Sequence, residues 1–394
     1  MQQDPIVIIG AARTPMGAFQ GDFSGLAAHD LGGVAIRAAV ERAGIAPESV
    51  GEVLFGNCLM AGQGQAPARQ AGFKGGLPKS AGAVTLSKMC GSGMKAAMFA
   101  HDMLLAGTHD VIVAGGMESM TNAPYLLQKG RGGYRLGHDR IFDHMMLDGL
   151  EDAYEPGRSM GTFGEDCAAK YGFTREQQDA FAVASVQRAK AATESGAFAA
   201  EIAPVTVKTR AGETVVSVDE GPGKVRLDKI PALKPAFKKD GTITAASSSS
   251  INDGAAALVM VRESTARRLG AVPIARIAGH AMHAQEPNWF TTAPVGATQK
   301  ALAQAGWSVQ DVDLWEVNEA FAVVPMALMR ELDVAHDIVN VNGGACALGH
   351  PIGASGARII VTLIHALQAR GKRRGLATLC IGGGEGTAMA IELV

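Results

Sequence analysis

A chain of 394 residues is too long for one small core, and with 47% hydrophobic and 19% charged residues it is too apolar to be disordered. Lys and Arg number 36 against 38 Asp and Glu, and the net charge of -2 excludes a strong field toward nucleic acid or an anionic membrane. No apolar stretch approaches the ~18 residues that span a bilayer, and the first residues lack the pattern of a secretory signal.

The first ~120 residues alternate short apolar runs with helix-like segments, which is typical of a layered α/β fold. Strands are expected at 6–9, 53–55, 83–86 and 111–114, and helices at 31–43 and 94–105. From 121 to 250 this alternation is lost, and one helix is expected, starting after Thr174 with the capping-box spacing Thr174 to Gln177. We interpret this stretch as an inserted, loop-rich domain.

The C-terminal part repeats the pattern of the first. Strands are expected at 255–261, 312–317, 376–381 and 388–393, and a buried helix at 357–369. Ser92-Gly93 starts a helix that leads to a strand ending in glycines, and Ser355-Gly356 does the same. The repeat indicates two related α/β halves that arose by duplication.

The cysteines indicate free thiols. There are five, at positions 58, 90, 167, 346 and 380, and none form a CxxC pair. An odd number without that spacing argues against a disulfide framework or a zinc cluster, so we expect a cytoplasmic protein.

Cys90 is the first candidate for chemistry, because it stands between an expected strand and an expected helix with glycines at 91 and 93. A helix N-terminus favours the thiolate and lowers the pKa of a cysteine, and small neighbours admit a substrate carbonyl. A buried structural cysteine would fit this position equally well.

His350 lies between Gly349 and Pro351, on an expected turn before a helix, where an imidazole can act as a base near neutral pH. The alternative is a loop histidine with its hydrogen bonds satisfied, but the many glycines around it favour a functional role. Cys346 falls in an apolar stretch, and we interpret it as packing.

Cys380 lies at the end of the expected strand 376–381, and Asn318 follows the expected strand 312–317. Glycines at 382–384 leave backbone N–H groups free, as an oxyanion hole requires, and strand ends in α/β folds face the ligand crevice. From spacing alone, a core cysteine and a helix N-cap remain the simpler interpretations. The glycine-rich stretches match no P-loop or dinucleotide motif, which argues against a nucleotide cofactor.

In chain order these segments resemble the thiolase family over essentially the whole chain. The individual motifs are short, but their order and spacing are specific. They are Arg13-Thr14-Pro15-Met16-Gly17, Cys90-Gly91-Ser92-Gly93, Gly115-Gly116-Met117-Glu118, Asn252-Asp253-Gly254, Asn318-Glu319-Ala320-Phe321, Gly349-His350-Pro351-Ile352-Gly353 and Cys380-Ile381-Gly382-Gly383-Gly384.

The resemblance implies a thiolase fold, a five-layered αβαβα core of two duplicated halves with an inserted loop domain. The halves would be residues 1–120, completed by 251–270, and 271–394, and the loop domain 121–250 would hold coenzyme A and make oligomer contacts. It implies a homo-oligomer. Residues 132–137 resemble the loop that joins dimers in tetrameric members, so we expect a homotetramer.

The resemblance also implies a reversible Claisen condensation of two acyl-CoA, as in an acetyl-CoA C-acetyltransferase, with coenzyme A as substrate and product and no metal or redox cofactor. Cys90 would carry the acyl group, His350 would take its proton, and Cys380 would remove the α-proton of the second acyl-CoA. His350 with a water held by Asn318 would stabilise the enolate, and backbone N–H groups of Cys90 and Gly382 would hold the tetrahedral intermediate.

By position in the family, further residues would line the coenzyme A tunnel, and two cations would lie near its adenosine phosphates. Acyl-chain preference stays open, because Ser159, Ser250, Phe290 and Glu385 depart from the usual family pattern. The expected tunnel residues are Leu150, Met160, Phe237, Ala245, Ser249, Phe290, Ala320 and Phe321, and the expected cations are Lys224 and Arg226.

Four other activities remain as alternatives. A degradative 3-ketoacyl-CoA thiolase would use the same residues on longer chains. A ketoacyl synthase typically pairs its cysteine with two histidines, and a silent scaffold on this fold would have lost a member of the Cys90, His350 and Cys380 set. A cysteine hydrolase would release free acid, which a product assay distinguishes.

Overall fold

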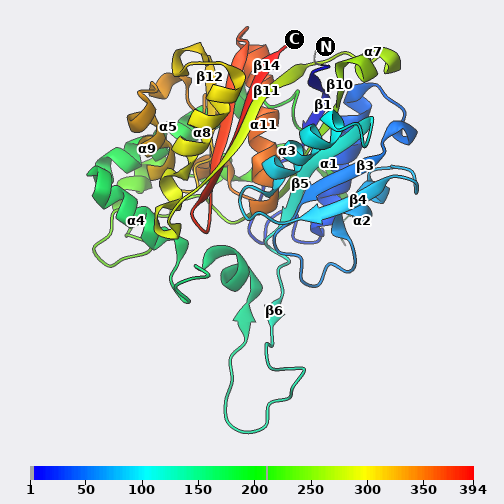
Figure 1. The fold of residues 1–394 in the computed structure, drawn as a ribbon. Helices are drawn as coiled ribbons and strands as arrows, with labels where there is room; N and C mark the ends of the chain where they lie inside the picture. The colour runs from blue at the N-terminus through cyan, green and yellow to red at the C-terminus, as the bar shows by residue number, and fades with distance from the viewer. Residues whose placement is uncertain (1–3, 210–211) are drawn as a thin grey trace.

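The computed structural model describes residues 4–209 and 212–394, and its centre is a pair of helices held between two sheets (Figure 1). The strands form one hydrogen-bonded sheet of ten strands, in which we call β1, β3, β4, β5 and β10 the N-terminal sheet and β11 to β14 the C-terminal sheet. Their bounds are Ile6–Arg13 for β1, Glu52–Gly56 for β3, Gly82–Leu86 for β4, Val111–Ser119 for β5, Asn252–Arg262 for β10, Ala275–Ala284 for β11, Leu314–Val317 for β12, Arg374–Ile381 for β13 and Glu385–Leu393 for β14.

The two sheets meet along β1 and β11, where Val7 pairs with Arg276 and Ile8 with Ala275. Hydrogen bonding therefore runs through both in the order β12-β13-β14-β11-β1-β10-β5-β3-β4, with the short β2 (Gly17–Ala18) beside β10. Within each half, strands that enclose a helix run parallel, as β3 does with β5 and β12 with β13. This mixed sheet brings the carboxyl ends of β4 and β13 toward the same region.

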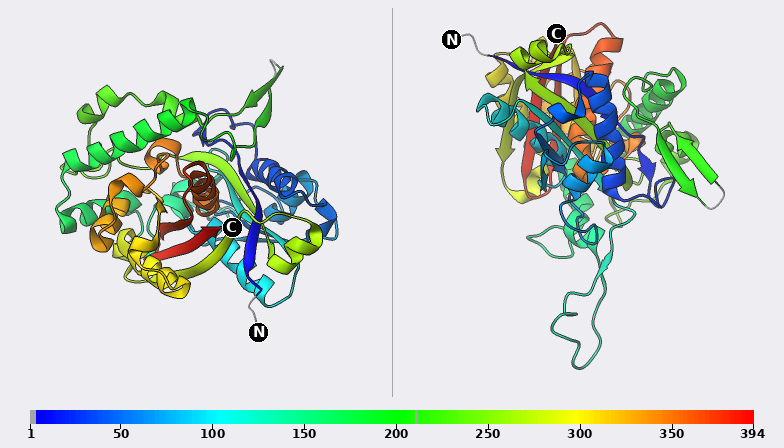
Figure 2. Two further views of the ribbon diagram at one scale, coloured as in Figure 1. Left: turned by 90° about the horizontal axis from the view of Figure 1, so that it is seen from above. Right: turned by 90° about the vertical axis from the view of Figure 1, so that its right-hand side faces the viewer.

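The helices complete the expected αβαβα layers. α3 (Ser92–Leu105) and α11 (Ile352–Ala369) pack between the sheets, against residues of both halves. α1 (Ala28–Ala43) and α2 (Pro67–Lys74) cover the outer face of the N-terminal sheet, and α8 (Ala293–Ala305) and α9 (Val323–Leu332) cover that of the C-terminal sheet. Seen from above, α11 lies in the middle of the molecule (Figure 2).

α11 is longer than the helix predicted from the sequence, and it forms an apolar stretch of a length that was not expected. Its 18 residues have a mean hydropathy of 1.3, enough by length and composition alone to cross a membrane, although no such stretch was expected. In the structure 83% of this window is buried, and its residues pack on both sheets, so it is a core helix. It starts five residues before the expected position, directly after Pro351, because proline is well suited to precede a helix.

Residues 121–250 contain more structure than the single expected helix. That helix, α5 (Arg175–Glu194), has the expected Thr174–Gln177 capping box. Beside it lies α4 (Met160–Tyr171), and a thin extension around β6 projects far from the body (Figures 1 and 2). The smaller elements of this stretch are β6 (Tyr125–Leu126), β7 (Phe142–Asp143), β8 (Val205–Thr209), β9 (Gly212–Val216) and α6 (Glu220–Lys224). Outside it lie the short helices α7 (Glu263–Leu269) and α10 (Ala345–Leu348).

Candidate active site

Cys90 lies on the turn between β4 and α3. Its predecessor Met89 has a φ of +45°, a left-handed backbone that directs the following residue out of the strand, and Gly91 caps the helix. Burial raises the pKa of Cys90 to about 11, although backbone N–H groups of Gly382 and of Cys90 itself act in the opposite direction. The lowered pKa expected from the helix dipole is therefore wrong for the unliganded site, because desolvation outweighs the helix terminus.

His350 is a neutral base with one nitrogen free. Ser355 Oγ donates to the carbonyl of Pro351 at 2.9 Å, so it accepts from Nδ1–H of His350 at 2.5 Å. Nε2 then carries the lone pair, and this atom is buried without a hydrogen-bond partner. Burial and the nearby Arg358 lower the pKa of His350 to about 3, which keeps the ring uncharged at neutral pH.

Cys380 is the second-last residue of β13 and is fully buried. Burial, and then the proximity of Cys90, raise its pKa well above the ordinary value of a thiol. Two thiols that influence each other in this way cannot easily both be thiolates, so the site accommodates one negative sulfur at a time.

Asn318 follows β12 and is not a helix cap, because α9 begins only at Val323. Its backbone N–H donates to the Thr378 carbonyl at 3.0 Å, which ties it to the strand that carries Cys380. Both polar atoms of its side-chain amide are buried and have no partner among the described residues. A buried amide left in this state is suited to hold a water molecule.

Cys90 and His350 meet at a narrow cavity of about 60 Å³ between the two halves, whereas the expected Cys380 and Asn318 are fully buried and do not line it. Of the expected site residues, Cys90, His350, Gly382, Leu150, Met160, Ser249, Phe290, Ala320 and Phe321 line it. Met89, Gly149 and Ile352 line it too and were missed. Met89 adjoins the nucleophile, Ile352 follows the His350-Pro351 turn, and Gly149 precedes the expected Leu150, so chain proximity was a usable signal for all three.

Four expected coenzyme A contacts do not line this cavity. Phe237 packs edge-on against Phe321, with ring centroids 5.7 Å apart, and Ala245 is exposed. Lys224 and Arg226 are 63% and 70% exposed, and they pair with Glu220 and Asp228. Exposed cations outside the cavity can meet only a part of a ligand that extends from it.

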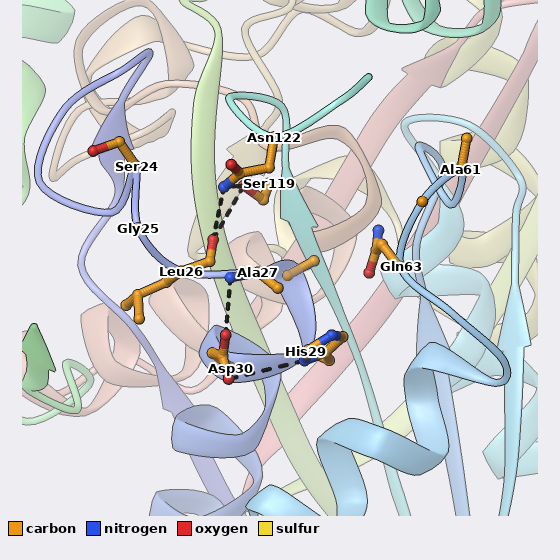
Figure 3. A pocket seen from close by; sticks show the side chains of 12 residues that line it. Ser24, Gly25, Leu26, Ala27, His29, Asp30, Ala61, Gln63, Ser119 and Asn122 are labelled. Atoms are coloured by element: carbon orange, nitrogen blue, oxygen red, sulfur yellow. Dashed lines mark hydrogen bonds and ion pairs between the residues drawn. The ribbon is translucent and has the colours of Figure 1, made fainter. Parts of the chain in front are cut away.

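A larger hollow of about 360 Å³ lies at the N-terminus of α1 (Figure 3). Its polar groups are occupied by each other: Asn122 donates to the Leu26 carbonyl and to Ser119 Oγ, both at 2.9 Å, and Asp30 accepts from the Ala27 N–H at 2.9 Å. None of the residues expected to carry chemistry lines it. Size therefore does not identify the site here, and the nucleophile, base and free N–H groups do.

Comparisons with known proteins agree with this geometry. Residues 6–264 match the model of the thiolase N-terminal domain and residues 271–393 that of the thiolase C-terminal domain. An acetyl-CoA acetyltransferase of Escherichia coli (strain K12) is 52% identical, with 98% of each chain covered.

Solved structures show the same fold at full length. The crystal structure of the Bacillus anthracis acetyl-CoA acetyltransferase superposes with a TM-score of 0.96 at 41% identity, covering 99% of both chains. A thiolase from Ascaris suum in complex with coenzyme A superposes with a TM-score of 0.93, also at 41% identity, covering 99% of this chain and 100% of that one. The chain described here belongs to the thiolase family.

Proposed function

We propose that the protein is an acetyl-CoA C-acetyltransferase, which condenses two acetyl-CoA to acetoacetyl-CoA and coenzyme A and catalyses the reverse thiolysis. The observation that carries this is the meeting, at one narrow cavity, of the Cys90 thiol, the free Nε2 of His350 and the Gly382 backbone N–H. Relatives about half identical in sequence carry the same activity in their names.

In the first step Cys90 attacks the thioester carbonyl of one acetyl-CoA. His350 Nε2 takes the thiol proton as the new C–S bond forms, and it returns the proton to the sulfur of the departing coenzyme A. Thiol exchanges with thiol, so the step is nearly balanced and reversible. The high pKa of Cys90 means that the proton must leave during the attack, which makes a positioned base essential.

In the second step Cys380, as a thiolate, takes a proton from the methyl group of the second acetyl-CoA. A water held by Asn318 and by the Nε2 lone pair of His350 donates a hydrogen bond to the enolate oxygen, and the carbanion attacks the acyl carbon on Cys90. Backbone N–H groups of Cys90 and Gly382 hold the oxyanion, and the loss of one such donor costs about 10²–10³ in kcat. The C–S bond to Cys90 then breaks, and the proton that Cys380 took passes to the Cys90 sulfur, which leaves Cys380 as a thiolate for the next cycle.

The cavity supports a preference for short acyl chains. Phe290 is 3% exposed and meets Phe163 edge-on at 6.0 Å between centroids, so it cannot swing away from the cavity without disturbing the packing behind it. A degradative thiolase of broader range remains the second candidate. Both enzymes would use the same catalytic residues, and only the depth of the acyl pocket would distinguish them.

Thiolysis with purified protein tests the proposal. Coenzyme A is added to acetoacetyl-CoA, 3-ketohexanoyl-CoA and 3-ketodecanoyl-CoA, and loss of the enolate absorbance is followed. We expect activity on acetoacetyl-CoA and much less on the other two. Comparable rates on all three would establish the broader enzyme, and no activity on any would overturn the assignment as an acetyltransferase.

The loop domain 121–250 would bind the coenzyme A arm along Leu150, Met160 and Ser249, and exposed Lys224 and Arg226 would approach its phosphates. Replacing both cations with Gln should raise the KM for coenzyme A and leave kcat nearly unchanged. A fall in kcat at constant KM would contradict this placement.

We also propose a homotetramer in the cytoplasm. The extension from β6 to β7 ends in exposed apolar side chains, with Leu136 fully exposed and Ile141 65% exposed, which a monomer would not favour. The cysteines in the described part of the chain form no disulfide, in keeping with a reducing compartment. Light scattering should give a mass of four chains, and Leu136→Asp should reduce it to two.

A further inference from the structure

A cluster of two histidines and one aspartate lies outside the cavity, where α3 faces β11. His101 and Asp102 are consecutive residues in α3, and His280 comes from the middle of β11. His280 Nε2 lies 3.0 Å from His101 Nδ1 and 3.1 Å from Asp102 Oδ1. The His101 Nδ1 to Asp102 Oδ1 distance is also 3.1 Å, so the three atoms form a nearly equilateral triangle.

Hydrogen bonds alone cannot satisfy all three edges of this triangle. If both ring nitrogens carry protons, the edge between the two histidines sets donor against donor. If only one carries a proton, the other nitrogen faces the carboxylate oxygen as acceptor against acceptor. A cation bound by all three atoms removes this conflict, because every lone pair then points at a positive charge.

The size of the triangle matches one coordination geometry. Ligand atoms about 2.1 Å from a six-coordinate ion lie about 3.0 Å apart when adjacent, whereas tetrahedral ligands at that distance lie about 3.4 Å apart. The observed 3.0 to 3.1 Å therefore corresponds to one face of an octahedron. Two imidazoles and a carboxylate in this arrangement are a recurring donor set for divalent first-row transition ions.

One side of the triangle is open to a ligand. The buried Nδ1 of His280 has no hydrogen-bond partner in the described chain, so no contact on that side of the ring competes with the triangle. Asp102 is 57% exposed, which leaves the open side of the triangle toward solvent. Lys95, six residues before His101 in α3, directs its Nζ to Met282 Sδ at 3.0 Å and not to the triangle.

We propose that His101, Asp102 and His280 form a binding site for one divalent transition ion, held by three protein ligands with the remaining positions open to water. None of these residues lines the catalytic cavity, so the site is separate from the acyl-transfer chemistry. Its two elements also tie the helix that starts beside Cys90 to the C-terminal sheet.

Calorimetric titration with NiCl₂ tests the site on the untagged full chain, stripped with chelator and with Cys90 blocked by iodoacetamide so that its thiol does not compete. We expect one Ni²⁺ per chain. Asp102→Asn and His280→Gln should each weaken binding at least about tenfold. His109→Gln is the matched control, because His109 sits 3.7 Å from Glu52 but has no second histidine, and it should bind as the parent does.

Absence of binding up to about 1 mM Ni²⁺ would overturn the proposal, because a weaker affinity is that of a nonspecific contact. Equal binding by the parent and all variants would overturn it too. If His280→Gln fails to fold, Asp102→Asn decides the question, since its side chain is exposed. Both variants should keep parental thiolysis rates before cysteine blocking. X-ray absorption at the nickel edge should show six ligands with two imidazoles, and a four-coordinate thiolate spectrum would contradict the assignment.

Discussion

A Ser-Gly pair begins α3 and lies at the fourth and fifth residues of α11, but the two serines have different partners. Ser92 Oγ donates to the Met89 carbonyl at 2.6 Å and accepts from the Lys88 N–H at 2.8 Å, so it fixes the backbone that presents Cys90. Ser355 Oγ bonds the Pro351 carbonyl and His350 Nδ1, so it fixes a side chain. The N-terminal half thus uses its serine to position a nucleophile, and the C-terminal half uses its serine to position a base.

The glycines after these serines have kept the same role in both halves. A Cβ on Gly356 would lie 2.4 Å from the backbone nitrogen of Met94, and one on Gly93 would lie 2.7 Å from that of Ala357. The two helix starts therefore touch backbone to backbone. This contact sets the distance between the part of the site that carries Cys90 and the part that carries His350.

The largest expected effect comes from removing the nucleophile of the N-terminal half. Cys90→Ala should lower both thiolysis and condensation by about 10⁴ or more, because no acyl-enzyme can form. Initial rates in both directions measure this. Cys346→Ala is the control, since that thiol packs against Phe181 and Ala322, and it should change the rates only a few-fold.

Removing the second thiol should separate the two steps. Cys380→Ala should lower condensation by about 10³, because the α-proton has no acceptor, while Cys90 still becomes acetylated. Exchange of labelled coenzyme A into acetyl-CoA reports the first step alone and should persist. Loss of this exchange together with condensation would show that Cys380 is also needed for acylation.

Replacing Gly356, which forms the C-terminal half's side of the contact between the two helix starts, should destabilise the fold. Gly356→Ala should lower the free energy of unfolding by about 3 kcal/mol, because the new methyl group meets backbone that cannot rotate away. Denaturant unfolding measures this. Gly25→Ala, where a Cβ meets nothing within 4 Å, should be nearly neutral, and an equal loss in both variants would contradict the contact.

Replacing Ser355 should mainly affect catalysis, whereas replacing Ser92 should mainly affect stability. Ser355→Ala frees His350 to adopt the wrong tautomer, and we expect kcat to fall about 10- to 100-fold with little change in KM. Ser92→Ala should mainly lower stability. Partial rescue by Ser355→Thr would support a role in holding the imidazole, and equal effects of both alanine variants on kcat would remove the distinction.

Much of this arrangement could be predicted from the sequence, because strand ends, glycines and the repeated Ser-Gly are local signals. The motifs singled out Cys90, His350 and Gly382, and these three residues line one cavity. Contacts made by folding could not be foreseen: nothing in the spacing shows that Ser355 holds His350. The two exposed cations, Lys224 and Arg226, were placed by family position, and sequence alone gives no distance to the cavity.

The sequence-based expectation of a lowered pKa for Cys90 was wrong, because burial of the thiol outweighs the helix N-terminus. A helix N-terminus can be identified from sequence, but the burial that outweighs it arises only when both halves pack together around Cys90. Because the pKa is raised to about 11, the fraction of Cys90 present as thiolate increases about tenfold for each unit by which the pH is raised, as long as the pH stays below that value. Alkylation of Cys90 by iodoacetamide in the unliganded enzyme should therefore accelerate about tenfold per unit from pH 7 to 9.5. A plateau near pH 8 would mean that the helix terminus and the Gly382 N–H outweigh burial, and that the N-terminal half holds its nucleophile as a thiolate before substrate arrives.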